Sequence, residues 1–230
     1  MKQALILLHG AISSKKQFDP LLPFIDDQFE VHALNFPGHG GSEIPAEPFS
    51  IPMFASSVLD YLDREKISAA SIFGYSMGGY AGLYLAAHYP QRVKKLFTLA
   101  TKLEWTEQIA EKETAQLNPA KISEKVPAFA KYLAQTHYPQ DWQKVLQKTS
   151  GMLLHLGKYP VLSKKDFQQI KIPVIIGLGE LDKMVSVDES ENATGHLENG
   201  QLLMLPSTPH PFEKVNHHSL SGYMNSFFSG

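Results

Sequence analysis

The sequence predicts an α/β fold in which one mainly parallel, doubly wound sheet of about six strands carries helices on both faces. Three observations support this class. Short and almost continuously apolar runs recur along the chain, which is typical of parallel strands buried on both faces. Helical stretches separate most of these runs, as parallel strands require. The chain has 230 residues, 43% of them hydrophobic, and is therefore long enough for one sizeable core.

Each predicted strand is a short apolar run, and each predicted helix is a stretch between two such runs or after the last one. The strands are expected at Ala4–Leu8, Val31–Leu34, Ser71–Phe73, Leu96–Ala100, Val174–Leu178 and Gln201–Leu205. The helices around them are expected at Phe18–Phe24, Met53–Glu65, Gly78–His88, Asp188–Ala193 and His217–Phe228.

The pattern changes between Thr101 and Lys171, where the sequence predicts three further helices. They are expected at Trp105–Leu117, Val126–His137 and Trp142–Leu156, separated by Asn118-Pro119, Tyr138-Pro139 and Gly157. A structureless loop of this length is uncommon in a compact domain. We therefore expect residues 102–171 to form a helical cap, inserted into a core made of residues 1–101 and 172–230.

The segment Gly74-Tyr75-Ser76-Met77-Gly78 has the form G-x-S-x-G. An apolar run precedes it and a helical stretch follows it, which is the strand–turn–helix context of a nucleophile elbow. The sharp turn lifts the serine hydroxyl above the sheet, and the glycines let strand and helix approach closely. Ser76 is therefore the predicted nucleophile.

A serine hydroxyl needs a base, and the chain supplies a carboxylate and a histidine after later strands. Asp182 follows the strand that ends near Gly179, and His210 follows the strand that ends at Leu205. Both positions lie at the carboxyl edge of a parallel sheet, where such folds place their sites. Asp182 would orient His210, which would take the proton from Ser76.

Other residues are alternatives to this assignment. Glu180 and Asp188 are close enough in sequence to replace Asp182 as the acid. His217 or His218 could replace His210 as the base. These two adjacent helical positions point about 100° apart, so they make a poor metal-binding pair.

Three further segments complete a resemblance to a known family. Leu7–Ala11 contains an H-G-x loop, Asn35–Ser42 contains P-G-H-G-x-S, and Ala86–Val93 resembles an exit from the helix after the elbow. Because of these three segments and the elbow, the chain resembles the α/β-hydrolase superfamily. The resemblance implies a lid after the fourth strand and an oxyanion hole to which Ala11 gives a backbone N–H.

Mechanism assigns the second oxyanion donor to the backbone N–H of Met77, the residue after the nucleophile. The histidines of the two glycine-rich loops, His9 and His39, are expected to hold loop geometry. The predicted function is a serine hydrolase that cleaves a small ester, thioester or related acyl substrate through an acyl-enzyme. Epoxide hydrolases and haloalkane dehalogenases of this superfamily have Asp at the position of Ser76, which argues against both activities.

Two other functions remain open. The first is a carbon–carbon bond hydrolase or lyase of aromatic or keto-acid substrates, in which Lys102, Lys112 or Lys131 would bind a substrate carboxylate. The second is a ligand-binding module that keeps the fold without turnover.

The cap residues Trp105, Phe129, Tyr132 and Trp142 are the expected substrate-binding residues, lining an apolar pocket over Ser76. The alternative is that these aromatic side chains only pack the cap helices together.

Composition excludes several classes of partner. A net charge of −2 gives no reason to expect nucleic acid or an anionic membrane surface, so the expected partner is a small acyl compound. The absence of cysteine excludes disulfides and Cys-ligated metal, and neither a metal nor a cofactor is expected. The apolar N-terminal run ends at His9 and is interpreted as a strand, not a signal peptide. No run approaches the roughly 20 apolar residues of a membrane span, so the cytoplasm is the default location. The sequence does not indicate an oligomeric state.

Overall fold

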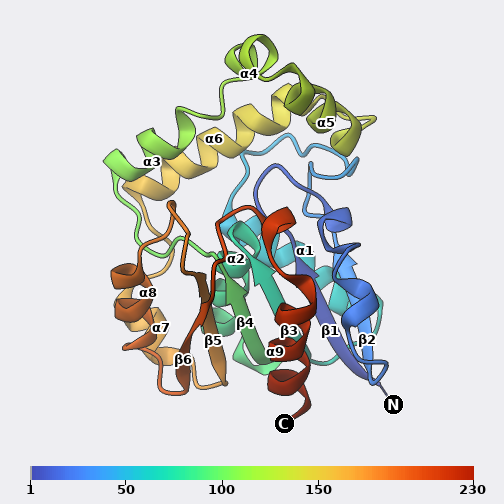
Figure 1. The fold of residues 1–230 in the computed structure, drawn as a ribbon, viewed down its shortest axis with the longest axis vertical. Helices are drawn as coiled ribbons and strands as arrows, with labels where there is room; N and C mark the ends of the chain where they lie inside the picture. The colour runs from blue at the N-terminus through green and yellow to red at the C-terminus, as the bar shows by residue number, and fades with distance from the viewer. Residues whose placement is uncertain (1) are drawn as a thin grey trace.

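One parallel sheet organises the chain, as a computed structural model that describes residues 2–230 shows (Figure 1). Within these residues the sheet has six strands in the order β2-β1-β3-β4-β5-β6, and all five pairings are parallel. The strands are β1 (Gln3–Leu8), β2 (Phe29–Leu34), β3 (Ala70–Tyr75), β4 (Val93–Leu99), β5 (Val174–Gly179) and β6 (Gly200–Leu205). The predicted fold class is confirmed, and the strand that leads into Ser76 is central.

Four of the predicted helices of the core are present at nearly the expected positions. They are α1 (Ile51–Arg64), α2 (Met77–His88), α8 (Val187–Thr194) and α9 (His217–Ser229). The helix predicted at Phe18–Phe24 is wrong, because that region forms two 3₁₀ turns, η1 (Lys15–Phe18) and η2 (Leu22–Phe24). Pro20 and Pro23 lack the N–H groups that an α-helix needs there. Two further 3₁₀ turns are η3 (Pro90–Arg92) and η4 (Phe212–Lys214).

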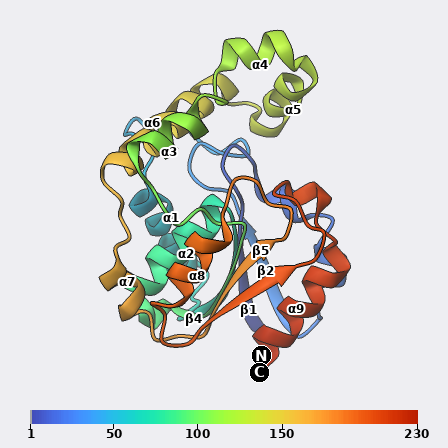
Figure 2. The ribbon, with the colours of Figure 1, turned by 60° about the vertical axis from the view of Figure 1, so that its left-hand side comes forward.

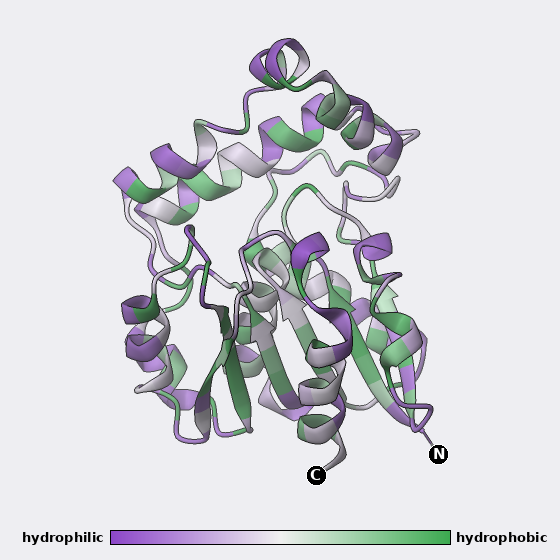
Figure 3. Cartoon of the chain, in the orientation of Figure 1, coloured by the Kyte–Doolittle hydropathy of each residue, from purple (hydrophilic) through white to green (hydrophobic). Residues whose placement is uncertain are grey.

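Helices cover both faces of the sheet, α9 on one side and α1, α2 and α8 on the other (Figure 2). Alternate side chains of β1 serve the two faces. Leu5 and Leu7 join the core cluster with α9, whereas Ile6 and Leu8 join the cluster with α1 and α2, and all four are fully buried. Two-sided burial is the reason why β1 and β5 are almost entirely apolar, and both are largely green in Figure 3.

Four helices lie across the carboxyl edge of the sheet, above α2 in Figure 1. They are α3 (Glu107–Thr114), α4 (Pro119–Lys125), α5 (Pro127–His137) and α6 (Trp142–Lys158). The sequence did not predict α4, because Asn118-Pro119 was interpreted as a break. Instead Asn118 caps the helix by accepting the N–H of Lys121 at 3.0 Å, with Pro119 at its first position. Trp105 precedes α3, which begins after its cap Thr106.

The segment 102–171 also contains α7 (Lys164–Gln169), which the sequence did not predict. Phe167 of α7 is buried in the cluster that also contains α2, and α7 contacts α2. Figure 2 shows α7 beside the core, apart from α3–α6. The domain boundary at residue 171 stays a prediction. In the described part of the chain, no helix combines the length and the apolar character needed to cross a bilayer.

Candidate active site

Ser76 stands at the turn between β3 and α2 in a strained backbone conformation. Its φ of 50° and ψ of −117° are unusual for a residue with a side chain. The Ser76 N–H donates to the carbonyl of Leu99 on β4 at 2.8 Å, and the Thr101 hydroxyl donates to the Ser76 carbonyl at 3.1 Å. A Cβ on Gly78 would collide with the carbonyl of Leu8, which explains the second glycine of the elbow. The neighbouring strands thus hold the turn in place.

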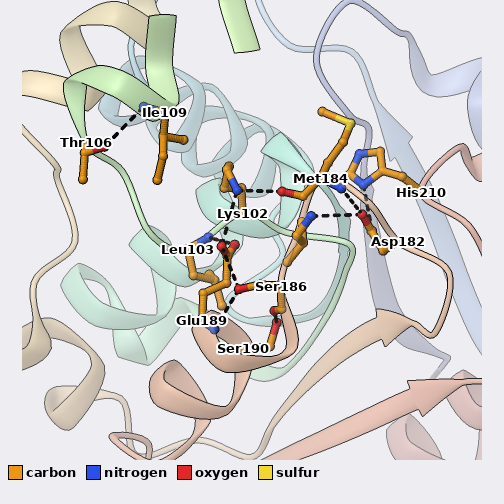
Figure 4. Close-up of polar contacts among 11 residues, drawn as sticks. Lys102, Leu103, Thr106, Ile109, Asp182, Met184, Ser186, Glu189, Ser190 and His210 are labelled. Carbon is orange, nitrogen blue, oxygen red and sulfur yellow. Dashed lines mark hydrogen bonds and ion pairs between the residues drawn. The ribbon is translucent and has the colours of Figure 1, made fainter. Parts of the chain in front are cut away.

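Asp182 lies in the turn after β5 and is joined to His210 (Figure 4). Its Oδ2 accepts the His210 Nδ1–H at 2.8 Å, while its Oδ1 accepts the N–H groups of Met184 at 2.8 Å and Val185 at 3.0 Å. The carboxylate is only 1% exposed. Burial would raise the pKa of Asp182, but the His210 ring and the two N–H groups outweigh it and hold that pKa below its ordinary value.

The ring of His210 is fixed by its partners. Because the Asp182 carboxylate can only accept, Nδ1 carries the proton and Nε2 keeps its lone pair. The Tyr75 hydroxyl donates to the His210 carbonyl at 2.6 Å, so the residue before Ser76 also holds the histidine loop. Ser76 and His210 line one cavity, but no hydrogen bond joins their side chains within residues 2–230. That bond stays a prediction, and such bonds often tighten only with substrate.

Two backbone N–H groups are available beside the serine. Ala11, after β1, and Met77, at the start of α2, both line the cavity, and neither N–H donates a hydrogen bond to another described residue. The preceding Gly10 N–H donates to the Gln17 side-chain oxygen at 3.0 Å, which fixes the start of the loop. The N–H groups of Ala11 and Met77 can donate hydrogen bonds to a negatively charged substrate oxygen.

The cavity has a volume of about 450 Å³ and extends from Ser76 to the cap helices. Most of its lining is apolar, from Ile51, Tyr80, Met152, Leu153, Leu156, Met184 and Val185 among others. Trp105, Phe129 and Tyr132 line it, and their role in substrate binding stays a prediction.

Trp142, the fourth residue expected to bind substrate, lies elsewhere. It packs against a cap cluster of three buried side chains, Ile122, Leu133 and Leu146. The reason is its place at the first position of α6, beside α5, whereas the part of α6 that faces the cavity begins at Met152. For Trp142 the alternative interpretation, packing between cap helices, is the one that applies.

Lys102 lines the cavity, but its charge is already neutralised (Figure 4). Its Nζ donates to the Met184 carbonyl at 2.6 Å and to Glu189 at 3.3 Å. The Glu189 carboxylate is 4% exposed and also accepts the Leu103 N–H. Neither Lys112 nor Lys131 is among the described residues that line the cavity.

The alternative acids and bases lie away from this arrangement. The ring of His217 packs on Phe212 with a centroid distance of 5.1 Å, and that of His218 packs on Phe24 at 5.6 Å. Glu180 accepts the backbone N–H of a residue in the loop after β6. Asp188 stands in the first turn of α8. Of the four, none lines the cavity in the part of the chain described.

A group of three buried histidines joins three segments of the chain. The ring centroids of His9 and His39 are 5.3 Å apart, and those of His39 and His137 are 5.7 Å apart. All three are fully buried, and burial lowers the pKa of each, that of His9 to about 4. Across residues 2–230, no cluster of three or more histidine, aspartate or glutamate side chains is arranged to hold a metal ion.

These histidines bond to backbone groups. His9 donates from Nδ1 to the Gly10 carbonyl and accepts the Phe36 N–H, as expected of a residue that holds loop geometry. His39 likewise bonds the carbonyl of Pro37. Sequence reasoning did not single out His137, because its bonding partners are 97 and 125 residues away.

Comparisons with known proteins agree with this architecture. The profile of the alpha/beta hydrolase fold family matches residues 3–155. The chain is 28% identical over 228 residues to a pimeloyl-[acyl-carrier protein] methyl ester esterase of Neisseria meningitidis, covering 90% of this chain and 86% of the relative. It is 24% identical over 218 residues to 3-oxoadipate enol-lactonase 2 of Acinetobacter baylyi, covering 90% and 82%.

Solved structures show the same fold over the whole chain. An enol-lactonase from Burkholderia xenovorans superposes with a TM-score of 0.79 at 17% identity, covering 100% of this chain and 92% of its own. MenH from S. aureus superposes with a TM-score of 0.79 at 20% identity, covering 99% and 93%. The sheet, the elbow and the family match agree, and the chain belongs to the alpha/beta-hydrolase fold family of enzymes.

Proposed function

We propose that this protein is a serine hydrolase that cleaves a small ester, thioester or related acyl compound through an acyl-enzyme. Ser76 is the nucleophile, His210 the base and Asp182 the residue that orients it. The observation that carries the proposal is the 2.8 Å bond from His210 to the buried Asp182 beside a cavity that also contains the strained Ser76.

The first half of the reaction uses the lone pair that His210 keeps on Nε2. Ser76 Oγ attacks the acyl carbon while its proton passes to Nε2. The negative charge that develops on the acyl oxygen is stabilised by the N–H groups of Ala11 and Met77. When the intermediate collapses, His210 returns the proton to the leaving alcohol or thiol, and the acyl group stays on Ser76.

The second half repeats these steps with water as the nucleophile. His210 removes a proton from water, the resulting hydroxide attacks the acyl-enzyme, and the carboxylic acid leaves as Ser76 recovers its proton. Asp182 keeps the proton of His210 on Nδ1 in both halves, and its lowered pKa keeps it ionised near neutral pH.

Size and polarity of the cavity support a small apolar acyl group. A volume of about 450 Å³ lies in the range of small-molecule sites, and its lining is mostly aliphatic and aromatic. Two of the relatives are named for a methyl ester and for an enol-lactone, which are both carboxylic esters. We therefore place a carboxylic ester first among the acyl compounds.

The charges of the cavity count against a carbon–carbon bond hydrolase or lyase of keto acids. Such substrates carry a carboxylate that needs a cation. Lys102 is the one Lys or Arg among the described lining residues, and it is held by Glu189 and the Met184 carbonyl. Engaging a substrate carboxylate would require breaking that pair and leaving the buried Glu189 carboxylate uncompensated.

A fluorophosphonate probe and an ester panel test the proposed function together. The wild-type protein should be labelled, because an activated serine attacks the probe, and it should hydrolyse p-nitrophenyl esters of short acyl chains. The Ser76→Ala variant is the control and should lose both reactions. A folded wild-type protein that is neither labelled nor active would instead support a ligand-binding module without turnover.

A further inference from the structure

The oxyanion loop contains a backbone conformation that its own sequence does not favour. The Ser13 N–H and the Gly10 carbonyl close a turn at 3.4 Å, and Ile12, the third residue of this turn, has a φ of 53°. Glycine or asparagine normally occupies such a position, and a β-branched residue there is strained. Strain of this kind persists only where surrounding contacts impose it.

Those contacts come from the cap. The side chain of Ile12 packs against the cap cluster of Ile122, Leu133 and Leu146. Its carbonyl accepts a hydrogen bond from Nε2 of His137, the last residue of α5, at 3.1 Å. Both the side chain and the backbone of Ile12 are therefore held by residues more than 100 positions away in the sequence.

His137 holds a second core loop at the same time. The Gly40 N–H donates to His137 Nδ1 at 3.2 Å, which leaves the ring proton on Nε2 for the Ile12 carbonyl. The neutral ring thus serves as donor and acceptor at once, without exposure to solvent. A second loop contact lies next to it, because a Cβ on Gly41 would meet the carbonyl of Tyr138 at 2.6 Å.

From this geometry we infer that His137 and Ile12 are positioning residues through which the seated cap places the Ala11 N–H in the oxyanion hole. This inference rests on the proposed function. The cap then has a role in rate as well as in substrate choice. If α5 moves away, the Ile12 carbonyl loses its donor, the side chain leaves the cap cluster, and the turn relaxes with Ala11, the residue before Ile12.

The expected effect is on turnover more than on binding. Loss of one oxyanion donor costs about 10²–10³-fold in kcat, and a displaced donor is expected to cost somewhat less, on the order of 10- to 100-fold. With p-nitrophenyl acetate, whose acyl group is too short to fill the cavity, KM should change by less than about threefold, because ground-state contacts with the cap are few.

Two substitutions at residue 137 separate hydrogen bonding from packing. His137→Phe keeps a ring and removes both hydrogen bonds, whereas His137→Gln keeps one donor and one acceptor. His155→Phe is the matched control, because His155 is an exposed cap residue that packs on Tyr159. Each folded variant is assayed for kcat and KM with p-nitrophenyl acetate and for the rate of fluorophosphonate labelling.

We expect His137→Phe to lower kcat and labelling rate together, His137→Gln to recover most of the loss, and His155→Phe to behave like the wild type. Ile12→Ala tests the same clamp without a change in the histidine group. It removes the contact with the cap cluster but keeps the Cβ that disfavours a positive φ, so it should also lower kcat. The inference is overturned if folded Ile12→Ala or His137→Phe keeps wild-type kcat, or if the Gln variant loses as much as the Phe variant. If wild-type turnover does not depend on Ser76, the proposed function fails instead.

Discussion

Replacing Asp182 by Asn tests the assignment of the acid with almost no change in shape. In the wild type, Oδ1 accepts two backbone N–H groups and Oδ2 accepts the His210 Nδ1–H. The Asn side chain has one acceptor and one donor group. Its oxygen is expected at the position of Oδ1, because the N–H groups of Met184 and Val185 both point there. The NH₂ group must then face His210.

The opposite orientation of the amide is unfavourable. It would place NH₂ against the N–H groups of Met184 and Val185 and lose both hydrogen bonds, at about 1–3 kcal/mol for an unsatisfied group at the buried residue Val185. Moving the imidazole proton from Nδ1 to Nε2 costs less, so His210 changes tautomer and Nε2 can no longer accept the Ser76 proton. We expect kcat to fall by about 10⁴-fold, which corresponds to about 5.4 kcal/mol in the activation barrier, with little change in KM.

The assay is steady-state hydrolysis of p-nitrophenyl acetate near neutral pH, after circular dichroism has verified that the variant is folded. Asp188→Asn is the matched control, because Asp188 undergoes the same chemical change on α8, and it should keep wild-type turnover. A folded Asp182→Asn protein with wild-type kcat would refute the reasoning. A loss in Glu180→Gln instead would move the role to that residue.

Three further predictions follow from the site and its surroundings. Ser76→Ala should lower kcat by about 10⁶-fold and abolish fluorophosphonate labelling, and residual labelling at another residue would contradict the assignment. The folded pKa of His9 is lowered from 6.5 to about 4, so the unfolded chain takes up a proton first as pH falls. Stability should therefore be complete above pH 6.5 and decrease towards pH 4, by at most about 3 kcal/mol for this residue. His9→Asn should show a shallower dependence of Tm on pH in this window, and parallel curves would exclude the effect. Trp105→Ala should shift the preferred acyl length of the ester panel upwards, since each buried methylene contributes about 0.8 kcal/mol until the pocket is full. Trp142→Ala should lower stability without moving that preference, and an equal shift in both variants would mean that Trp142 reaches the substrate.

The sequence by itself determined the fold class and the chemistry of the proposed triad. Parallel strands that are buried on both faces have apolar central residues, so their positions could be predicted from short apolar runs in the sequence. The elbow could be predicted because its glycines, its serine and the flanking strand and helix are adjacent in the chain. Asp182 and His210 could be predicted because the carboxyl ends of parallel strands meet at one edge of the sheet.

Only the tertiary structure decided which cap residues face the cavity and what holds the oxyanion loop. The aromatic residues Trp105 and Trp142 look alike in sequence, yet one lines the cavity and the other packs against the cap cluster. In the sequence, Lys102 is a candidate cation for a substrate carboxylate. The fold pairs it with Glu189, which is distant in the sequence. The contacts of His137 with Ile12 and Gly40 join residues 125 and 97 positions apart. Local sequence patterns cannot predict such long-range contacts, because the contacts depend on how the cap packs against the sheet.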